Sequence, residues 1–128
     1  MTTLSRAFQS AVQIIGTGDA YVTLSGTTEI FSSAINLTAH MGAHAEIDVN
    51  FDSTPTDNVE YRVYGSLDGT NWAPMALIVG VIDKDTDPNG PPIVIEKVAY
   101  ARIGVKQTGS TDSHDVRAYV RTWNYTSA

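Results

Sequence analysis

The segment DTDPNGPPIVIE, residues 85–96, has the residue types and spacing of a calcium-binding loop. In an EF-hand, side-chain oxygen atoms at the first, third and fifth positions bind Ca²⁺, a glycine makes a sharp turn, and a bidentate glutamate closes the site at the twelfth position. Those five positions are occupied here by Asp85, Asp87, Asn89, Gly90 and Glu96. The first question is therefore whether this chain binds calcium.

The segments on either side of the loop argue against an EF-hand. An EF-hand places a helix on each side, whereas both flanks here, ALIVGVI and IVIE, are rich in the β-branched residues typical of strands. If residues 93–96 are extended at roughly 3.3 Å per residue, Glu96 is carried about 10 Å further from the ion. Pro91 and Pro92 stiffen the segment toward the same extended geometry. We therefore do not expect an EF-hand.

A simpler cation site in the same loop is the remaining alternative. Its oxygen ligands would come from Asp83, Asp85, Asp87 and Asn89. The Asp-Pro and Asn-Gly pairs of the loop are, however, also the residues that a wide hairpin turn needs. We interpret the segment as a structural turn, and we predict neither a bound metal nor a cofactor.

Three further sets of side chains could do chemistry, but none is spaced for it. Neighbouring side chains on a strand point to opposite faces, so His114 could not orient toward both Ser113 and Asp115 as a hydrolase triad requires. His40 and His44 have the spacing of a helical metal pair, but on a strand they lie about 13 Å apart. The acidic residues that could form a glycosidase pair are Glu46, Asp48 and Glu60, and they fall on polar faces of alternating segments. We predict a protein that is not an enzyme.

The elements that position these side chains have a hydrophobic period of two. Apolar and polar residues alternate over residues 44–51, 59–66, 100–107 and 115–123. Clusters of Gly, Asp, Asn, Ser and Thr separate these segments at the spacing of an all-β sandwich. We predict one antiparallel, jelly-roll-like β-sandwich of about eight strands over residues 11–128. Its predicted core contains Ile47, Val49, Val63, Ile103 and Val105.

Composition narrows the classes of partner. The 128-residue chain has a net charge of -6, which argues against nucleic acid or an anionic membrane as its main partner. It has no cysteine, so disulfides and zinc-thiolate sites are excluded. No apolar run approaches the roughly 20 residues of a membrane span, and the first ten residues lack the apolar region of a secretory signal peptide.

The segment SLDGTNW, residues 66–72, is the most distinctive turn of the chain. Asp68 and Gly69 form a tight-turn signal after a strongly alternating strand. Trp72 lies just beyond the turn, where it can either anchor the end of the core or form an exposed aromatic platform for a sugar or a protein. An exposed Trp72 beside Asp and Asn would favour a carbohydrate-binding module.

Together with ARI at residues 101–103 and RTW at residues 121–123, this turn resembles small β-sandwich proteins of tailed-bacteriophage virions. The resemblance covers about residues 20–125. It implies a capsid decoration (cement) protein that binds the major capsid protein as an oligomer on the capsid exterior, after synthesis in the host cytoplasm. A tail or neck component is the alternative within the same resemblance.

Residues suited to protein contacts lie in two places. Tyr, Trp and Arg are enriched at interfaces, and the predicted outward face of the last strand carries Arg117, Tyr119, Arg121 and Trp123. The first ten residues are predicted to be an extended arm, in which Leu4, Arg6 and Phe8 share one face. We expect this arm and Trp72 to belong to the partner interface, with Leu4 and Phe8 touching a second chain.

Calcium should change the stability of the protein little. A ligand at about 100 times its dissociation constant stabilises the folded state by about 2.7 kcal/mol, so a real site would be visible in thermal unfolding. We expect the same Tm in chelator and in millimolar calcium. A rise of more than about 5 °C that disappears in Asp85→Ala would show that the loop is a calcium site.

Overall fold

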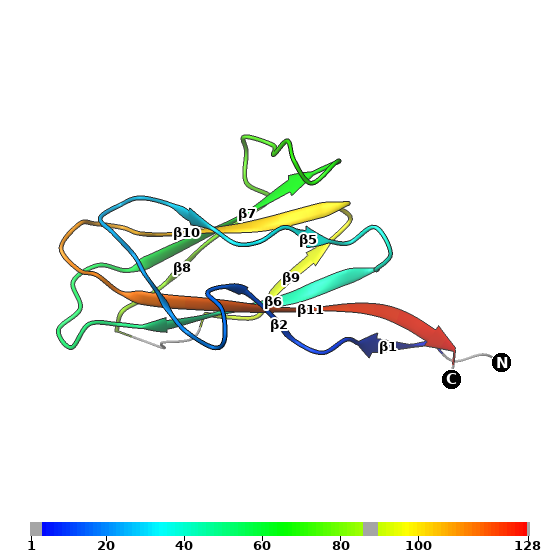
Figure 1. The fold of residues 1–128 in the computed structure, drawn as a ribbon, viewed down its shortest axis with the longest axis horizontal. Helices are drawn as coiled ribbons and strands as arrows, with labels where there is room; N and C mark the ends of the chain where they lie inside the picture. The colour runs from blue at the N-terminus through cyan, green and yellow to red at the C-terminus, as the bar shows by residue number, and fades with distance from the viewer. Residues whose placement is uncertain (1–3, 86–89, 128) are drawn as a thin grey trace.

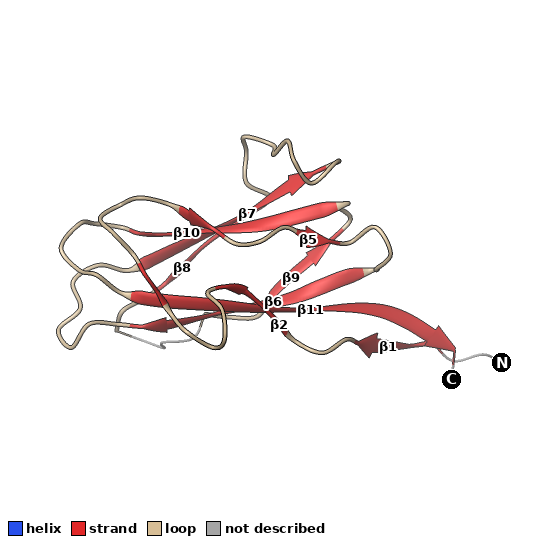
Figure 2. Cartoon of the chain, in the orientation of Figure 1, coloured by secondary structure: helices blue, strands red, loops and turns tan. Residues whose placement is uncertain are grey.

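The computed structural model describes residues 4–85 and 90–127, with side chains for residues 7–85 and 90–124. Within these residues the chain forms eleven strands and no helix. The strands make two antiparallel sheets that pack face to face (Figure 1 and Figure 2). None of the described segments is a helix long and apolar enough to cross a membrane. The prediction of an all-β sandwich is therefore confirmed.

The first sheet is built around its longest strand, β11. Its strand order is β1 (Leu4–Phe8), β11 (Asp115–Ser127), β6 (Gly42–Asn50) and β9 (Ile93–Glu96). Two further strands, β2 (Val12–Ile15) and β3 (Val22–Thr23), also pair with β11. Every residue of β11 is thus paired on at least one side, because β6 pairs with residues 115–123 and β1 with residues 123–127, while β2 and β3 pair with shorter parts of the strand.

The second sheet is shorter and has β10 at its centre. Its strand order is β4 (Ile30–Phe31), β10 (Tyr100–Gln107), β7 (Val59–Ser66) and β8 (Ile78–Ile82), and β5 (Ile35–Asn36) also pairs with β10. The strands outnumber the predicted eight because β3, β4 and β5 have two residues each. Two residues are too few to produce a period in the sequence.

The core lies between the two sheets and follows the alternation of the sequence. In β6 the residues Ala43, Ala45, Ile47 and Val49 are at most 1% exposed. The facing strands β7 and β10 contribute Val59, Tyr61, Val63, Ala101, Ile103 and Val105. All five core residues predicted from the sequence are buried, because the period of two keeps each apolar set on one face of its strand.

The N-terminal segment lies along the end of β11 in the same chain. β1 pairs with β11 so that Phe8 is opposite Trp123. In Figure 1 these two strand ends extend together beyond the second sheet. The side chains of Leu4 and Arg6 are outside the described residues, so their predicted contact with a second chain stays a prediction.

Replacing Ile103 by alanine should destabilise the fold strongly. Ile103 is fully buried at the centre of β10, so its truncation removes apolar contacts and leaves a cavity. We expect a loss of about 2–4 kcal/mol in the free energy of unfolding, measured by urea denaturation. Val12→Ala, at a position that is 60% exposed, is the control and should change it by less than about 0.5 kcal/mol. A loss for Ile103→Ala no larger than the control's would contradict the burial.

Candidate functional site

The calcium-like loop connects two strands, β8 and β9, as the sequence predicts. The Oδ1 atom of Asp83 accepts a hydrogen bond from the Asp85 backbone N–H at 2.8 Å, and Asp85 pairs with Lys84 at 2.7 Å. Asp87 and Asn89 lie outside the described residues. Because strands flank the loop, the EF-hand arrangement is excluded, and the two described carboxylates serve the local turn.

His114 is fully buried, and its two ring nitrogens contact backbone atoms of Asp52 and Asp57. Its Nδ1 atom accepts a hydrogen bond from the Asp52 N–H at 3.1 Å, and its Nε2 atom lies 2.8 Å from the Asp57 carbonyl oxygen. Asp115 instead accepts a hydrogen bond from Thr23. Ser113, His114 and Asp115 therefore form no triad, as the strand geometry predicts.

His114 belongs to a buried polar cluster where the chain crosses between the sheets. Two backbone N–H groups, of Thr56 and Asp57, donate to the Asp112 carboxylate at 2.7 Å. The Asp57 carboxylate reciprocates by accepting from the N–H groups of Thr111 and Asp112 at 2.9 Å. The cluster thus ties the β6–β7 loop to the β10–β11 loop.

The same cluster contains three groups with metal-ligand chemistry, namely Asp52, Asp112 and His114. Their ligand atoms lie within 4.8 Å of one another. However, both ring nitrogens of His114 contact backbone groups, and the carboxylates of Asp52 and Asp112 accept backbone N–H donors. A metal bound to His114 would have to break one of its two ring-nitrogen contacts, so we interpret the cluster as structural.

The other candidate ligands and acids are separated by the fold. His40 lies near Asn124, whereas the ring of His44 lies 5.2 Å from that of Phe8. Asp48 pairs with Arg117 on the first sheet, at 2.8 Å, and Glu60 pairs with Arg62 on the second, at 2.7 Å. No catalytic carboxylate pair of the type considered from the sequence is assembled among these residues.

The DGTNW turn is held by its own polar side chains. Asp68 accepts hydrogen bonds from the N–H groups of Thr70 and Asn71 and from the Asn71 side chain, each at 2.8 Å. These hydrogen bonds lower the pKa of Asp68 well below its ordinary value, and the bond from the Asn71 N–H has the largest effect. The Ser66 hydroxyl donates to the Asn71 carbonyl at 2.6 Å. The hydrogen-bonding groups of the turn are therefore largely used within it.

Trp72 is half-buried and takes part in a stack on the outer face of the second sheet. The guanidinium of Arg102 lies 3.9 Å from the ring centroid of Phe31 and 4.7 Å from that of Trp72. These are cation–π distances. Asp68 and Asn71 line an open hollow beside the indole, but the turn already uses their polar atoms, which weakens the case for a sugar platform.

The outer face of the first sheet gathers most of the interface residues predicted from β11. Arg117, Tyr119 and Arg121 alternate with the buried Val116, Ala118 and Val120, so they share that face. Arg117 donates to Asp48 and to the Asp19 carbonyl at 2.8 and 2.7 Å. The Tyr119 hydroxyl donates to Asp19 at 2.6 Å, and this hydrogen bond raises the pKa of Tyr119. Arg117 and the Tyr119 hydroxyl are therefore held in place within the chain.

Trp123 is the exception among these predicted interface residues. The alternation predicts an outward Trp123, but the residue is only 2% exposed. It pairs with Gly42 on β6, and a Cβ atom on that glycine would lie 2.7 Å from the indole ring. The indole ring packs against the backbone of Gly42, where no side chain is in the way. Trp123 therefore belongs to the packing of this chain and not to an exposed interface.

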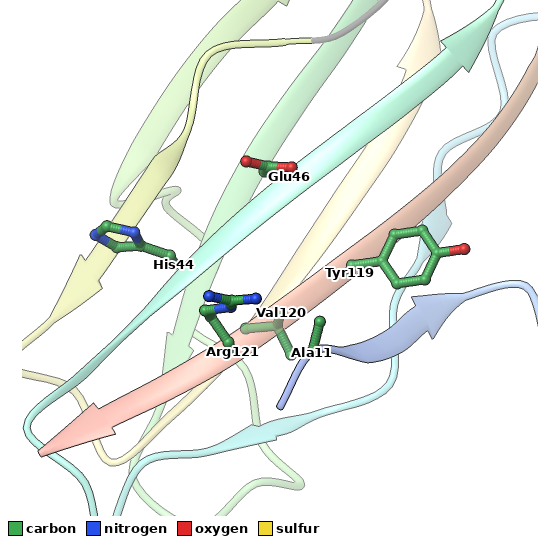
Figure 3. Close-up of a pocket in the computed structure, with 6 residues that line it drawn as sticks. All are labelled: Ala11, His44, Glu46, Tyr119, Val120 and Arg121. Carbon is green, nitrogen blue, oxygen red and sulfur yellow. The ribbon is translucent and has the colours of Figure 1, made fainter. Parts of the chain in front are cut away.

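A groove of about 250 Å³ remains open on this face (Figure 3). Its lining residues are Ala11, His44, Glu46, Tyr119, Val120 and Arg121. Figure 3 shows the Arg121 side chain directed from β11 toward β6, which carries His44 and Glu46. Arg121 and Glu46 are exposed and form no hydrogen bond or ion pair with the described residues, and the Nε2 atom of His44 is buried without a hydrogen-bond partner there.

Sequence reasoning considered His44 only as a metal ligand and Glu46 only as a catalytic acid. The register of β6 against β11 places them opposite Arg121 and Tyr119. Alternation alone puts all four side chains outward, but it does not say that these two strands are neighbours. The pairing of distant strands is what assembles the groove.

Comparisons with known proteins give little help in assigning this site. No protein family and no curated protein matches the sequence. A solved structure that is similar is the crystal structure of Yersinia pseudotuberculosis-derived mitogen (YPM), at 13% sequence identity and a TM-score of 0.49. The match covers 93% of this chain and 86% of that chain. A similarity at this level carries no argument about function.

This finding corrects the resemblance to tailed-bacteriophage virion proteins. The similarity found is to a bacterial mitogen and not to a phage protein, so the phage resemblance is wrong. The structure supplies a physical reason for the most distinctive motif. Ser66, Asp68 and Asn71 satisfy the hydrogen bonds of a tight turn, and such a turn suits a β-hairpin whatever the origin of the protein.

Acid should weaken the fold through Asp112. The N–H groups of Asp57 and then Thr56 lower the pKa of this carboxyl group. Its stabilisation is therefore complete above the unfolded-state pKa of about 3.9 and is lost as the pH falls through the lower folded-state value. We expect the urea midpoint of the wild type to fall with pH below about 4, and that of Asp112→Asn, already lower at pH 7, to fall less steeply.

Ser110→Ala, at an exposed position of the β10–β11 loop, is the control and should follow the wild-type pH dependence. Equal slopes for Asp112→Asn and the wild type would mean that the cluster does not depend on the charge of Asp112.

Proposed function

We propose that this chain is a non-enzymatic binding protein that holds a protein partner on the outer face of its first sheet. The contact is centred on the groove between β11 and β6, where Arg121, Glu46 and Tyr119 meet the solvent beside Phe8. The observation that carries the proposal is that Arg121 and Glu46 are exposed and form no hydrogen bond or ion pair with the described residues, whereas Arg117 and Tyr119 on the same face bond within the chain.

The residue types of this face suit a protein contact. Phe8 is 40% exposed, its ring lies 5.2 Å from His44, and the Arg121 guanidinium lies 5.9 Å from the Phe8 ring centroid. Aromatic residues and arginine are the types most often found at the energetic centre of protein interfaces. The hydrogen bonds that fix Arg117 and Tyr119 pre-order the surface, which lowers the entropy lost on binding.

The size of the groove also favours a protein over a small molecule. Pockets that enclose small ligands usually have volumes of about 300–1,000 Å³. This groove measures about 250 Å³ and lies on the surface of a sheet. A protruding side chain of a partner fits such a space. The opposite charges of Glu46 and Arg121 favour a partner surface that presents an acidic and a basic group side by side.

The proposal is tested by placing a photo-crosslinking residue in the groove. Ala11 lines the groove and is exposed, so it can be replaced by benzoylphenylalanine without disturbing the core and without removing Arg121 or Glu46. Irradiation in an extract of the cells that produce the protein should give one discrete crosslinked partner. Excess unlabelled wild type should remove this product, whereas Arg121→Glu should compete at least tenfold less well, a difference of about 1.4 kcal/mol.

The same photo-crosslinking residue at Ser110, exposed in the β10–β11 loop, is the control and should not give this product. Equal crosslinking from both positions, or equal competition by Arg121→Glu and the wild type, would refute a partner site in the groove.

Three functions were predicted from the sequence, and each differs from this proposal. The roles of capsid decoration protein and of tail or neck component rested on the phage resemblance, and no other observation supports them. Carbohydrate binding at Trp72 stays a prediction, which retardation of the protein in polysaccharide gels would test. Retardation that is lost in Trp72→Ala and kept in Arg121→Glu would favour the sugar-binding alternative over the groove.

A further inference from the structure

β8 is an edge strand of the second sheet and has the composition of a strand that is normally covered. Among the strands that the structure describes, it pairs with β7 alone, on one side. On the outer face, Val79 is 60% and Val81 52% exposed. Residues 70–82 contain no charged side chain. Edge strands usually avoid pairing with other chains by carrying charges or prolines, and β8 carries neither.

The sequence of this strand, IVGVI, reads the same in both directions about Gly80. Antiparallel pairing of two such strands, related by a two-fold axis at Gly80, places Val79 of each opposite Val81 of the other. The core-facing side of β8 also allows this register, because Gly80 has no side chain there. A Cβ atom there would lie 2.2 Å from the ring of Tyr61, so the tyrosine fills the space beneath the glycine.

The neighbouring strand makes this register complementary in charge. Arg62 is the β7 partner of Val79, and Glu60 is the β7 partner of Val81. On the outer face, each row of side chains across the two-fold axis would therefore contain Arg62 and Val79 of one copy, followed by Val81 and Glu60 of the second copy. The acidic residues after β8, Asp83 and Asp85, would face the uncharged residues 75–77 of the other strand. No pair of like charges would be directly opposed.

We propose that β8 pairs antiparallel with β8 of a second copy of this chain, about a two-fold axis at Gly80, and joins the two second sheets into one. Pairing between two edge strands is formed by main-chain hydrogen bonds, and the exposed Val79 and Val81 side chains supply its specificity. A five-residue edge buries less than the roughly 1,200 Å² of a standard interface, so the dimer is weak, with a Kd near the micromolar range or above. It leaves the groove on the first sheet free.

The first test compares Val79→Glu with Val12→Glu by sedimentation equilibrium between about 5 and 500 μM. Both valines are 60% exposed, but Val12 lies on β2 of the other sheet. The glutamate that replaces Val79 would stand beside Arg62 in its own chain, so the variant should fold. We expect the wild type and Val12→Glu to dimerise alike, and Val79→Glu to dimerise at least tenfold more weakly.

The register is tested by restoring the pair with opposite charges. Val81→Lys alone should also weaken the dimer, while Val79→Glu combined with Val81→Lys should bring it back, because each glutamate then faces a lysine of the other copy. In any register that opposes Val79 to itself, the double variant would juxtapose two glutamates and stay monomeric.

Cysteine crosslinking gives an independent measurement, since the natural chain has no cysteine. Directly opposed residues have Cα atoms about 4.5–5.5 Å apart, within disulfide reach, whereas diagonal neighbours lie about 7–8 Å apart. A mixture of Val79→Cys and a size-tagged Val81→Cys should form the mixed disulfide faster than either forms its own dimer. A wild type that is monomeric at every concentration, equal weakening by Val79→Glu and Val12→Glu, or faster self-crosslinking would each overturn the proposal.

Discussion

The buried polar cluster around His114 is the constraint on which the rest of the fold depends. Two of the segments in which the chain crosses from one sheet to the other are the β6–β7 and β10–β11 loops, and the reciprocal bonds of Asp57 and Asp112 join these two loops. Gln107 completes the cluster by donating to the Asp112 carbonyl at 2.7 Å and accepting from the His114 N–H at 2.7 Å. Because buried backbone groups must be paired, the cluster fixes where both crossovers begin and hence the relative position of the sheets.

β11 organises the first sheet, because β1, β2, β3 and β6 all pair with it. It pairs on both sides, so its inward residues meet the core while its outward ones share a surface with β6. The groove on this face and the free edge of β8 belong to different sheets. A contact at one leaves the other accessible, so a protein of this shape suits an assembly in which each copy binds a partner and a second copy.

The motifs that attracted attention in the sequence mostly serve local structure. The calcium-like segment connects two strands, His114 of the apparent triad belongs to a buried cluster, and the polar groups of the DGTNW turn bond within the turn. Turn-forming residues are those with short polar side chains, which are also the residues of metal sites and active sites. A sequence match to a motif in a turn-rich β protein is therefore weak evidence for chemistry. The phage resemblance was wrong for a similar reason, because it rested on one turn motif and two short strand motifs.

The sequence by itself determined the fold class and the faces of the long strands, because a period of two is a local property of the chain. It identified the core of β6, β7 and β10 and the outward set of Arg117, Tyr119 and Arg121. The tertiary structure alone decided which strands became neighbours. That pairing brought His44 and Glu46 to Arg121, packed Trp123 against Gly42, and left β8 at an edge. These outcomes depend on contacts between residues far apart in the chain, which no local pattern encodes.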